Sequence, residues 1–366
     1  MHPAFDKRVF DKEAISLIKA GHEITHLCPG DFRNGSYSGV NVICYKQPLS
    51  IKHRCLQLFS LYKKANCVDA DVYHCNEVDS WVVGVALKIF KSKKCVFDVH
   101  EDYPSTFAES RFHTLLQPCV KFSIRLLLRL LIPFTDRIVL AKSSVSIDYP
   151  IHRSKKILVR NFTPKHFNTA NLPSTTKYDD EVFTLIHLGL FNKNRGWPQV
   201  LEALSLMKNK NIVLKTIGVF DDGSEDEFRH KVAHYRLQSR VKHLDWMPFK
   251  EAYEHMLKSH IGIVAFQPGI QNHVFAMPHK MFDYMSAGLA VLCPGFAVEV
   301  APIIKKTNSG LLINSADPQD IANKLDALLD APKNLKIMGL NGVKAVDEHY
   351  NWEAEAKVLI KMYEKL

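Results

Sequence analysis

The sequence predicts two α/β domains, each built on a doubly wound parallel sheet that helices cover on both faces. Short apolar stretches alternate with helical patterns along the chain, which is typical of such sheets. The alternation stops at a polar segment, residues 168–180, and then starts again. The length of 366 residues also suits two domains of ordinary size.

The first half is expected to form the N-terminal domain, residues 1–165. A helical pattern at residues 9–20 comes before any strand, whereas a doubly wound domain begins with a strand. We therefore expect this domain to lack its first strand. Its remaining strands are predicted at 23–28, 41–46, 71–75, 95–99, 136–141 and 157–160, with helices at 51–65, 79–90 and 118–132.

The second half is expected to form the C-terminal domain, residues 166–350. A last helix, residues 351–366, is predicted to pack back toward the N-terminal domain. The strands of the second domain are predicted at 183–189, 212–217, 241–245, 261–266, 289–293 and 310–313.

Charge is distributed unevenly along the chain. The formal net charge is +10, and 48 Lys and Arg stand against 38 Asp and Glu. Residues 1–165 hold 25 basic and 15 acidic residues, so the whole excess of +10 lies there. This asymmetry indicates an anionic partner for the first half. No nucleic-acid module is recognisable, so nucleic acid is not expected.

The helical pattern at 118–132 offers one way to meet an anionic surface. Lys121, Arg125 and Arg129 are spaced four apart and form a basic stripe beside a wide apolar arc. Such a helix is typical of a peripheral contact with an anionic membrane, although a core helix with a solvated stripe fits equally well. The eight cysteines form no C-x-x-C pair, and no signal peptide or spanning segment is seen. A cytoplasmic protein is expected, peripheral at the inner face of the membrane.

The most informative stretch runs from Pro278 to Gly288. It reads as a helix, with Pro at its start and Gly at its end, that leads into a buried strand. His279 and Lys280 stand at the helix N-terminus, where backbone N–H groups favour a phosphate. Asp283 lies one turn further and can accept hydrogen bonds from sugar hydroxyls. Alone, this stretch also fits an ordinary α/β crossover.

Two other segments follow strands at their carboxyl ends. Gly189 opens a loop that carries Arg195, whose forked guanidinium suits a diphosphate. His100 follows an apolar strand, at the edge where open sheets bind ligands, although a lone histidine is more often structural. A D-x-D motif at Asp69 and Asp71 is too short to be specific, and we interpret it as a solvated strand entry.

Together these segments resemble the glycosyltransferases of the GT-B fold, of the family 4 (group 1) kind. The resemblance covers nearly the whole chain, and its most specific piece is Pro278–Gly288. It implies two Rossmann-like domains that face a central cleft. It also implies retaining, metal-independent transfer of a hexose from a nucleotide-sugar to a glycan or lipid-linked acceptor, as in cell-surface polysaccharide synthesis. No cofactor is expected, since the nucleotide-sugar is a substrate.

The resemblance also implies roles for individual residues. Arg195 and Lys280 would hold the diphosphate, with Gly189 and His279 beside it. Asp283 takes the second position of the family's E-x7-E motif and would bind ribose. His100 would lie against the transferred sugar, so that His100, Arg195 and Lys280 form the catalytic set.

The sequence departs from the family pattern at several positions. Phe275 replaces the first carboxylate of E-x7-E, and Phe191 stands where many members carry a basic residue. These departures keep two alternatives open. One is a non-catalytic nucleotide-sugar-binding or scaffold subunit of a glycan-synthesis complex. The other is a different GT-B chemistry, such as nucleotide-sugar epimerisation.

Overall fold

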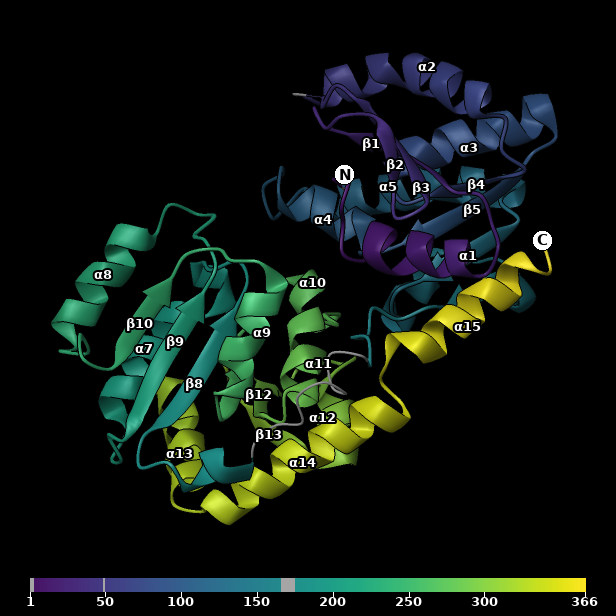
Figure 1. Ribbon diagram of the computed structural model, residues 1–366. Coiled ribbons are helices and arrows are strands. Elements are labelled where there is room, and N and C mark those ends of the chain that lie inside the picture. Colours follow the sequence, from purple (N-terminus) through teal and green to yellow (C-terminus); the bar gives the residue numbers. More distant parts are fainter. Residues whose placement is uncertain (1–2, 49, 166–174) are drawn as a thin grey trace. The chain divides into compact units, whose positions relative to one another are not determined.

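A computed structural model describes residues 3–48, 50–165 and 175–366. The chain forms two compact units (Figure 1). The N-terminal unit contains Met1–Asn161 and Trp352–Leu366, and the C-terminal unit contains Phe162–Asn351. Most of the polar segment expected to separate the domains, residues 168–174, lies outside the described residues.

The N-terminal unit contains seven strands within the described residues. Their bounds are β1 (Thr25–Pro29), β2 (Gly35–Tyr37), β3 (Val40–Tyr45), β4 (Val72–Cys75), β5 (Lys94–Val99), β6 (Arg137–Leu140) and β7 (Lys156–Leu158). A π-helical segment, η1 (Val9–Ala14), continues into α1 (Ile15–Lys19) ahead of β1. The other helices are α2 (Ile51–Val68), α3 (Val78–Lys91), α4 (Tyr103–Glu109), α5 (Gln117–Leu131) and α15 (Trp352–Tyr363), with short 3-10 turns at Ile132–Phe134, Ser143–Asp148 and Arg153–Lys155.

These strands form two sheets. One has the order β1-β3-β2 and the other has the order β4-β5-β6-β7. All pairs are parallel except β2–β3, which is antiparallel. β5 is buried along almost its whole length, which agrees with the apolar residues 95–97 at its centre. β2 was not predicted, because three residues of mixed polarity give no periodic signal.

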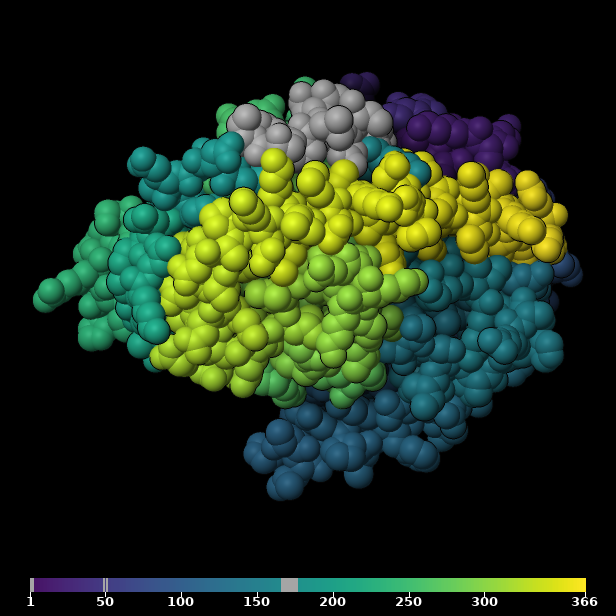
Figure 2. Space-filling view, turned by 90° about the horizontal axis from the view of Figure 1, so that it is seen from below, coloured from purple at the N-terminus to yellow at the C-terminus, as the bar shows by residue number. Residues whose placement is uncertain are grey.

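The C-terminal helix α15 belongs to the N-terminal unit. The Trp352 indole N–H donates to Ser16 Oγ at 2.9 Å, and Leu359 is fully buried in a core it shares with Val96 and Val139. The Glu355 carboxylate accepts a hydrogen bond of 2.8 Å from the backbone N–H of Arg160. In Figure 2, α15 appears in yellow along the teal surface of this unit.

The C-terminal unit contains six strands within its described residues. They are β8 (Phe183–Leu188), β9 (Ile212–Ile217), β10 (Val241–Leu244), β11 (Ile261–Ile263), β12 (Ala290–Pro294) and β13 (Gly310–Ile313). Its helices are α7 (Trp197–Leu206), α8 (Glu225–His234), α9 (Phe249–Leu257), α10 (Gln271–Val274), α11 (His279–Ser286), α12 (Ala301–Thr307), α13 (Pro318–Leu329) and α14 (Pro332–Glu348), with 3-10 turns η5 (Thr175–Asp179) and η6 (Lys193–Arg195).

All six strands form one parallel sheet in the order β10-β9-β8-β11-β12-β13. β8, β9 and β10 are visible side by side in Figure 1. Helices pack on both faces, because the two largest hydrophobic clusters of the unit lie on opposite sides of β8 and β11. The α/β fold with parallel sheets is therefore confirmed. No helix within the described residues is long and apolar enough to cross a membrane.

Candidate functional site

The candidate site lies at one edge of the C-terminal sheet. β8 is the first strand of the unit, and it lies between β9 and β11. The strand order therefore reverses next to β8, and open parallel sheets bind ligands outside the carboxyl ends of the strands at such a point. The loop after β8, the segment after β11 and helix α11 come together there.

The loop after β8 has a fixed shape. Gly189 has φ +99°, in the left-handed region that favours glycine. Asn192 Oδ1 accepts a 2.8 Å hydrogen bond from the backbone N–H of Arg195, and its Nδ2 donates to Asp221 at 2.7 Å. Gly196 has φ +82° and packs closely on the segment after β11. These contacts hold Arg195 in one place on the loop.

Helix α11 is anchored at the end of β8. The Leu188 backbone N–H donates to the Tyr284 hydroxyl at 2.8 Å, and the Tyr284 ring is fully buried. The ring packs on Gly262 of β11, where an added Cβ would lie 2.3 Å from it. Pro278 precedes the helix, and within the described residues no side chain caps its N-terminus. The first backbone N–H groups of α11 and Lys280 therefore lie at the carboxyl edge of the sheet.

Arg195 and Lys280, predicted separately from two segments, lie around one aromatic ring. The Arg195 guanidinium carbon is 5.4 Å from the centre of the Phe266 ring, and Lys280 Nζ is 5.8 Å from it. Lys280 Nζ also lies 3.2 Å from His187 Nε2, on β8. Sequence reasoning missed His187 and Phe266. A histidine in a mostly apolar strand, two residues before Gly189, was the available signal.

Burial perturbs all three basic groups. Burial, together with the neighbouring charge of Arg195, lowers the pKa of Lys280 well below its ordinary value. Burial also lowers the pKa of His187 well below its usual range, and Lys280 adds to this effect. The pKa of Arg195 is lowered by burial, partly offset by Asp221. The site therefore disfavours its own positive charges when no anion is bound.

The charges at this site are not balanced by neighbouring acids. In the part of the chain that the structure describes, neither Arg195 nor Lys280 forms a salt bridge with a carboxylate. The half-buried Arg195 and the buried Lys280 repel each other beside an uncapped helix N-terminus and are incompletely solvated. A bound dianion such as a diphosphate relieves both costs. The arrangement is therefore suited to binding a diphosphate.

His279 and Asp283 interact directly within α11. His279 Nδ1 lies 2.8 Å from Asp283 Oδ2, one helical turn away, and Asp283 is only 2% exposed. In this structure the carboxylate fixes the orientation of the His279 ring. Ribose binding by Asp283 stays a prediction.

The two phenylalanines that depart from the family pattern have different surroundings. Phe191 is buried in an aromatic cluster with His187, Phe220 and Phe228. It contributes to the core of the unit and offers no group to a ligand. Phe275 follows α10 and is half-buried.

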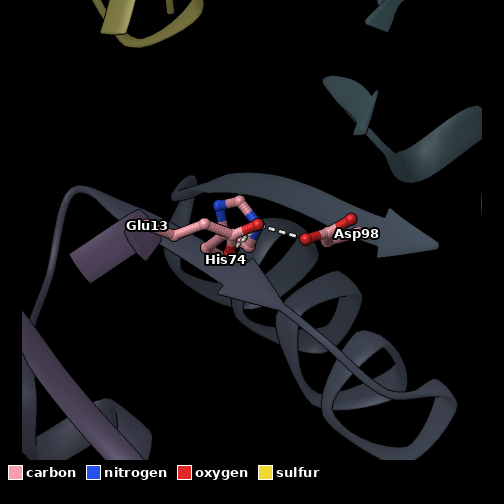
Figure 3. Close-up of side chains that lie close together, drawn as sticks. All are labelled: Glu13, His74 and Asp98. Carbon is pink, nitrogen blue, oxygen red and sulfur yellow. Dashed lines mark ion pairs between the residues drawn. The ribbon is translucent and has the colours of Figure 1, made fainter. Parts of the chain in front are cut away.

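His100 lies in the N-terminal unit, in a buried polar cluster at the carboxyl end of β5. Its Nε2 is 3.1 Å from Asp98 Oδ2, and the same carboxylate binds the Arg8 guanidinium at 3.0 and 3.1 Å. Glu13 and His74 lie close to Asp98 (Figure 3). The predicted role of His100 against the transferred sugar stays a prediction.

The pKa values of the two carboxylates in this cluster are shifted in opposite directions. Although burial acts in the opposite direction, Arg8 and His100 hold the pKa of Asp98 well below its usual range. Burial and the nearby Asp98 raise the pKa of Glu13 well above its ordinary value. Glu13, His74 and Asp98 have the donor types of a metal site, but Arg8 contacts both carboxylates. A metal ion would therefore have to displace a buried guanidinium, and the donor set fits a metal poorly.

Two of the three basic residues in the stripe of α5 form ion pairs within the protein. Lys121 pairs with Glu109 at 2.8 Å, and Arg125 pairs with Asp148 at 2.7 Å. Arg129 is exposed. The helix also exposes much apolar surface, at Phe122, Leu126, Leu127 and Leu130, with exposed fractions between 53% and 67%. The residues of α5 available to a membrane are therefore mainly apolar.

Comparison with protein families finds one match, which lies within the C-terminal unit. Residues 169–345 match the family described as glycosyl transferases group 1. Comparison with curated protein sequences finds no match.

Solved structures of similar fold extend over almost the whole chain. Alr3699/HepE from Anabaena, in complex with UDP, has a TM-score of 0.68 at 12% identity, over 89% of this chain and 86% of that one. Sucrose-phosphate synthase from Thermosynechococcus elongatus has a TM-score of 0.73 at 16% identity, over 96% and 90%. WaaG, a glycosyltransferase involved in lipopolysaccharide biosynthesis, has a TM-score of 0.71 at 13% identity, over 98% and 97%.

The fold and the comparisons together define a GT-B protein with two Rossmann-like units. Its residues 169–345 match the family model of the glycosyl transferases group 1. The resemblance stated from the sequence is thereby confirmed at the level of this group, and the cation pair lies within the matched region.

Proposed function

We propose that this protein is a retaining glycosyltransferase that transfers a hexose from a nucleotide-sugar to a glycan or lipid-linked acceptor. The observation that carries the proposal is the pair of the half-buried Arg195 and the buried Lys280 around Phe266, beside the N-terminus of α11. A UDP complex of HepE and the involvement of WaaG in lipopolysaccharide biosynthesis support the substrate class and a role in cell-surface polysaccharide synthesis.

The chemistry follows from where charge develops. In the transfer, the bond between the anomeric carbon and the β-phosphate oxygen breaks, and negative charge accumulates on the departing diphosphate. Arg195 binds two of its oxygens through its forked guanidinium, and Lys280 supplies a point charge. Fixed positive groups at this position stabilise the transition state more than the ground state. These two cations neutralise the diphosphate, so the proposal needs no metal.

The remaining residues position the substrates. Gly189 lets the backbone approach the donor, His279 lies beside the diphosphate, and Asp283, which contacts His279, binds the ribose. His100 of the N-terminal unit acts on the transferred sugar. The departing diphosphate accepts the proton of the acceptor hydroxyl, so the protein supplies no separate base.

The acceptor determines where the protein acts. A lipid-linked acceptor places it at the inner face of the cytoplasmic membrane. We propose that the apolar surface of α5, formed by Phe122, Leu126, Leu127 and Leu130, inserts between headgroups, with Arg129 close to anionic lipid.

Two measurements test the proposal. A thermal-shift screen with UDP, GDP and their sugars identifies the donor, because a ligand that binds the native state raises its melting temperature. Labelled donor is then incubated with membrane extract, and transfer and hydrolysis are followed. Arg195→Ala should weaken nucleotide binding by about 1.5–3 kcal/mol, roughly 10- to 150-fold.

A control variant is available in the same loop. Lys193→Ala removes an exposed lysine that pairs with Glu227, and it should leave nucleotide binding unchanged. If Arg195→Ala transfers sugar as well as the parent protein, the assignment of Arg195 is wrong.

A second candidate function rests on Phe275. Since a carboxylate that would touch the donor sugar is replaced, the protein could bind the nucleotide-sugar as a non-catalytic subunit. Donor binding with neither transfer nor hydrolysis in the labelled assay favours this candidate.

A further inference from the structure

His187 lies beside Lys280 and has no role in the function described so far. It stands on β8, and its side chain is only 3% exposed. Its ring meets the Phe191 ring edge-on, with 4.8 Å between the ring centres, so aromatic packing holds the imidazole in place. A polar ring that is buried this deeply needs hydrogen bonds within the protein.

One nitrogen of this ring has two neighbours. His187 Nε2 lies 3.2 Å from Lys280 Nζ and 3.3 Å from the Leu190 carbonyl oxygen. In the part of the chain that the structure describes, the other nitrogen, Nδ1, has no hydrogen-bond partner, and Lys280 Nζ has none besides His187. The position of the ring proton is therefore decided by the two contacts of Nε2.

These two contacts need opposite states of Nε2. A neutral imidazole carries one N–H group and one lone pair on its two nitrogens. The Leu190 carbonyl can only accept, so this contact needs the proton on Nε2. A charged lysine can only donate, so its contact needs the lone pair on Nε2 and the proton on Nδ1. Burial keeps the ring neutral, because it lowers the pKa of His187 well below its usual range.

We propose that His187 is a positioning residue for Lys280 and that the tautomer of its ring follows the charge of Lys280. When Lys280 is neutral, the Nε2–H group donates to the Leu190 carbonyl. When Lys280 is charged, the ammonium donates to Nε2, and this hydrogen bond fixes the direction of the ammonium. The part of His187 in ligand binding rests on the proposed function, in which a diphosphate keeps Lys280 charged.

The change of tautomer takes up one proton. Nδ1 gains a proton from solvent, and the proton on Nε2 passes to the Lys280 amine, 3.2 Å away. The ring is neutral before and after the change, and the amine becomes an ammonium. His187 therefore supplies the proton that Lys280 needs when an anion binds.

The other charge that acts on this pair is Arg195. It lies on the loop after β8 and contributes to the lowered pKa values of both His187 and Lys280, and Asp221 partly offsets the effect of burial on Arg195 itself. Among the described residues, no carboxylate raises the pKa of Lys280 or of His187. Since Arg195 stays charged over the accessible pH range, the tautomer should respond to Lys280.

The test of the tautomer needs no ligand. Nitrogen NMR of the full chain with isotope-labelled histidine distinguishes a protonated from an unprotonated ring nitrogen, and the signals of His187 are those missing from His187→Gln. At high pH, Nε2 should carry the proton, and below the lowered pKa of Lys280 the proton should lie on Nδ1. In Lys280→Met, Nε2 should keep the proton throughout. A single tautomer at every pH in the parent protein, or a change that persists in Lys280→Met, overturns the proposal.

Binding of UDP and GDP tests the positioning role. His187→Phe keeps an aromatic ring against Phe191 but removes the acceptor, whereas His187→Gln places an amide oxygen close to the position of Nε2. His187→Phe should weaken binding of the preferred nucleotide by about tenfold or more and move its loss of affinity to lower pH, because the ammonium loses its acceptor. His187→Gln should restore most of the affinity. Equal losses in the two variants, or no loss in His187→Phe, overturn the positioning role.

The two proposals fail in different ways. If the parent protein shows the change of tautomer but binds neither UDP nor GDP, the proposed donor site is wrong and the coupling of His187 to Lys280 is supported. If the parent binds a nucleotide and His187 keeps one tautomer with and without it, the donor site is supported and the coupling is overturned.

Discussion

Lys280 is a lysine whose charge depends on its ligand. Burial and Arg195 lower its pKa in the unliganded protein, so it loses its proton at a lower pH than an ordinary lysine. A bound diphosphate raises that pKa again, so binding takes up a proton. Affinity for the nucleoside diphosphate should therefore fall as pH rises between the lowered pKa of the free protein and the raised pKa of the complex, by at most about tenfold per pH unit. Calorimetry in buffers of different ionisation enthalpy measures both the affinity and the proton uptake.

The matched variant for this prediction is Lys280→Arg. Arginine stays protonated over this pH range, so the pH dependence should become flat. Proton uptake that persists in Lys280→Arg would assign the effect to a different group.

Lys177 should destabilise the C-terminal unit at low pH. Burial lowers its pKa to about 7 from an unfolded value near 10.5. Below pH 7 the buried amine is charged and its full penalty is present. Between pH 7 and about 10.5 the unfolded chain binds the extra proton, so stability rises by about 1.4 kcal/mol per pH unit. Lys177→Met should therefore raise the melting temperature at pH 6.5 more than at pH 9.5, and an equal gain at both values would contradict this.

The sequence predicted part of the candidate site at the level of single residues. Arg195 and Lys280 could be found because each stands at a recognisable position, a loop after a strand and a helix N-terminus. Their convergence on Phe266 could not be found, since it depends on how β8 and β11 pair. For Asp283 the sequence was less informative. Its position predicted ribose binding, whereas in the structure its buried carboxylate contacts His279.

At the scale of elements, the loop after β8 requires glycine at position 196, because a side chain has no room there. Gly196 has φ +82°, and an added Cβ would lie 2.1 Å from the Ala265 carbonyl oxygen. Gly223 has φ +70°, but an added Cβ there meets nothing within 4 Å. Gly223→Ala should cost about 1–2 kcal/mol of unfolding free energy, from backbone strain alone. Gly196→Ala should cost about 1–3 kcal/mol more and should weaken nucleotide binding, because Arg195 is its neighbour.

Denaturant unfolding of both alanine variants measures these differences. If Gly196→Ala and Gly223→Ala lower the unfolding free energy by similar amounts, the close approach of Gly196 to Ala265 does not contribute to stability.

Helix α5 is predicted to be the membrane contact. Its exposed leucines should bury apolar surface in a bilayer, each contributing up to about 1.5–3 kcal/mol. The triple variant Leu126→Ser, Leu127→Ser and Leu130→Ser should therefore lose at least about tenfold in binding to anionic vesicles in a sedimentation assay. The control, Leu56→Ser with Phe59→Ser, removes side chains of α2 that are equally exposed. An equal loss in both variants would argue against a specific role for α5.

At the level of elements, the sequence was sufficient wherever one continuous apolar run formed a strand. β12 is such a strand and is fully buried, whereas β5 and β8 contain shorter apolar runs, at residues 95–97 and 185–186. β2 was missed, since a three-residue antiparallel edge strand depends on β3 rather than on its own sequence. The division of the N-terminal strands into two sheets could only be seen in the structure.

At the scale of the whole molecule, both units use the same strand–helix arrangement and direct their polar residues to the carboxyl ends of the strands. The C-terminal unit places a cation pair there, and the N-terminal unit places the cluster of Arg8, Asp98 and His100. The cation pair suits a diphosphate, whereas the N-terminal cluster contains its own counter-charges. The proposed donor site therefore lies in the C-terminal unit.

The central claim is that Arg195 and Lys280 recognise the diphosphate. The most direct measurement is calorimetry with the nucleoside diphosphate found by thermal shift and with its nucleoside, on the parent protein and on Arg195→Met combined with Lys280→Met. The parent should bind the diphosphate at least about a hundredfold more tightly than the nucleoside, since two charge-assisted contacts are lost. The double variant should bind both ligands with similar affinity. A double variant that keeps the preference for the diphosphate would contradict the claim.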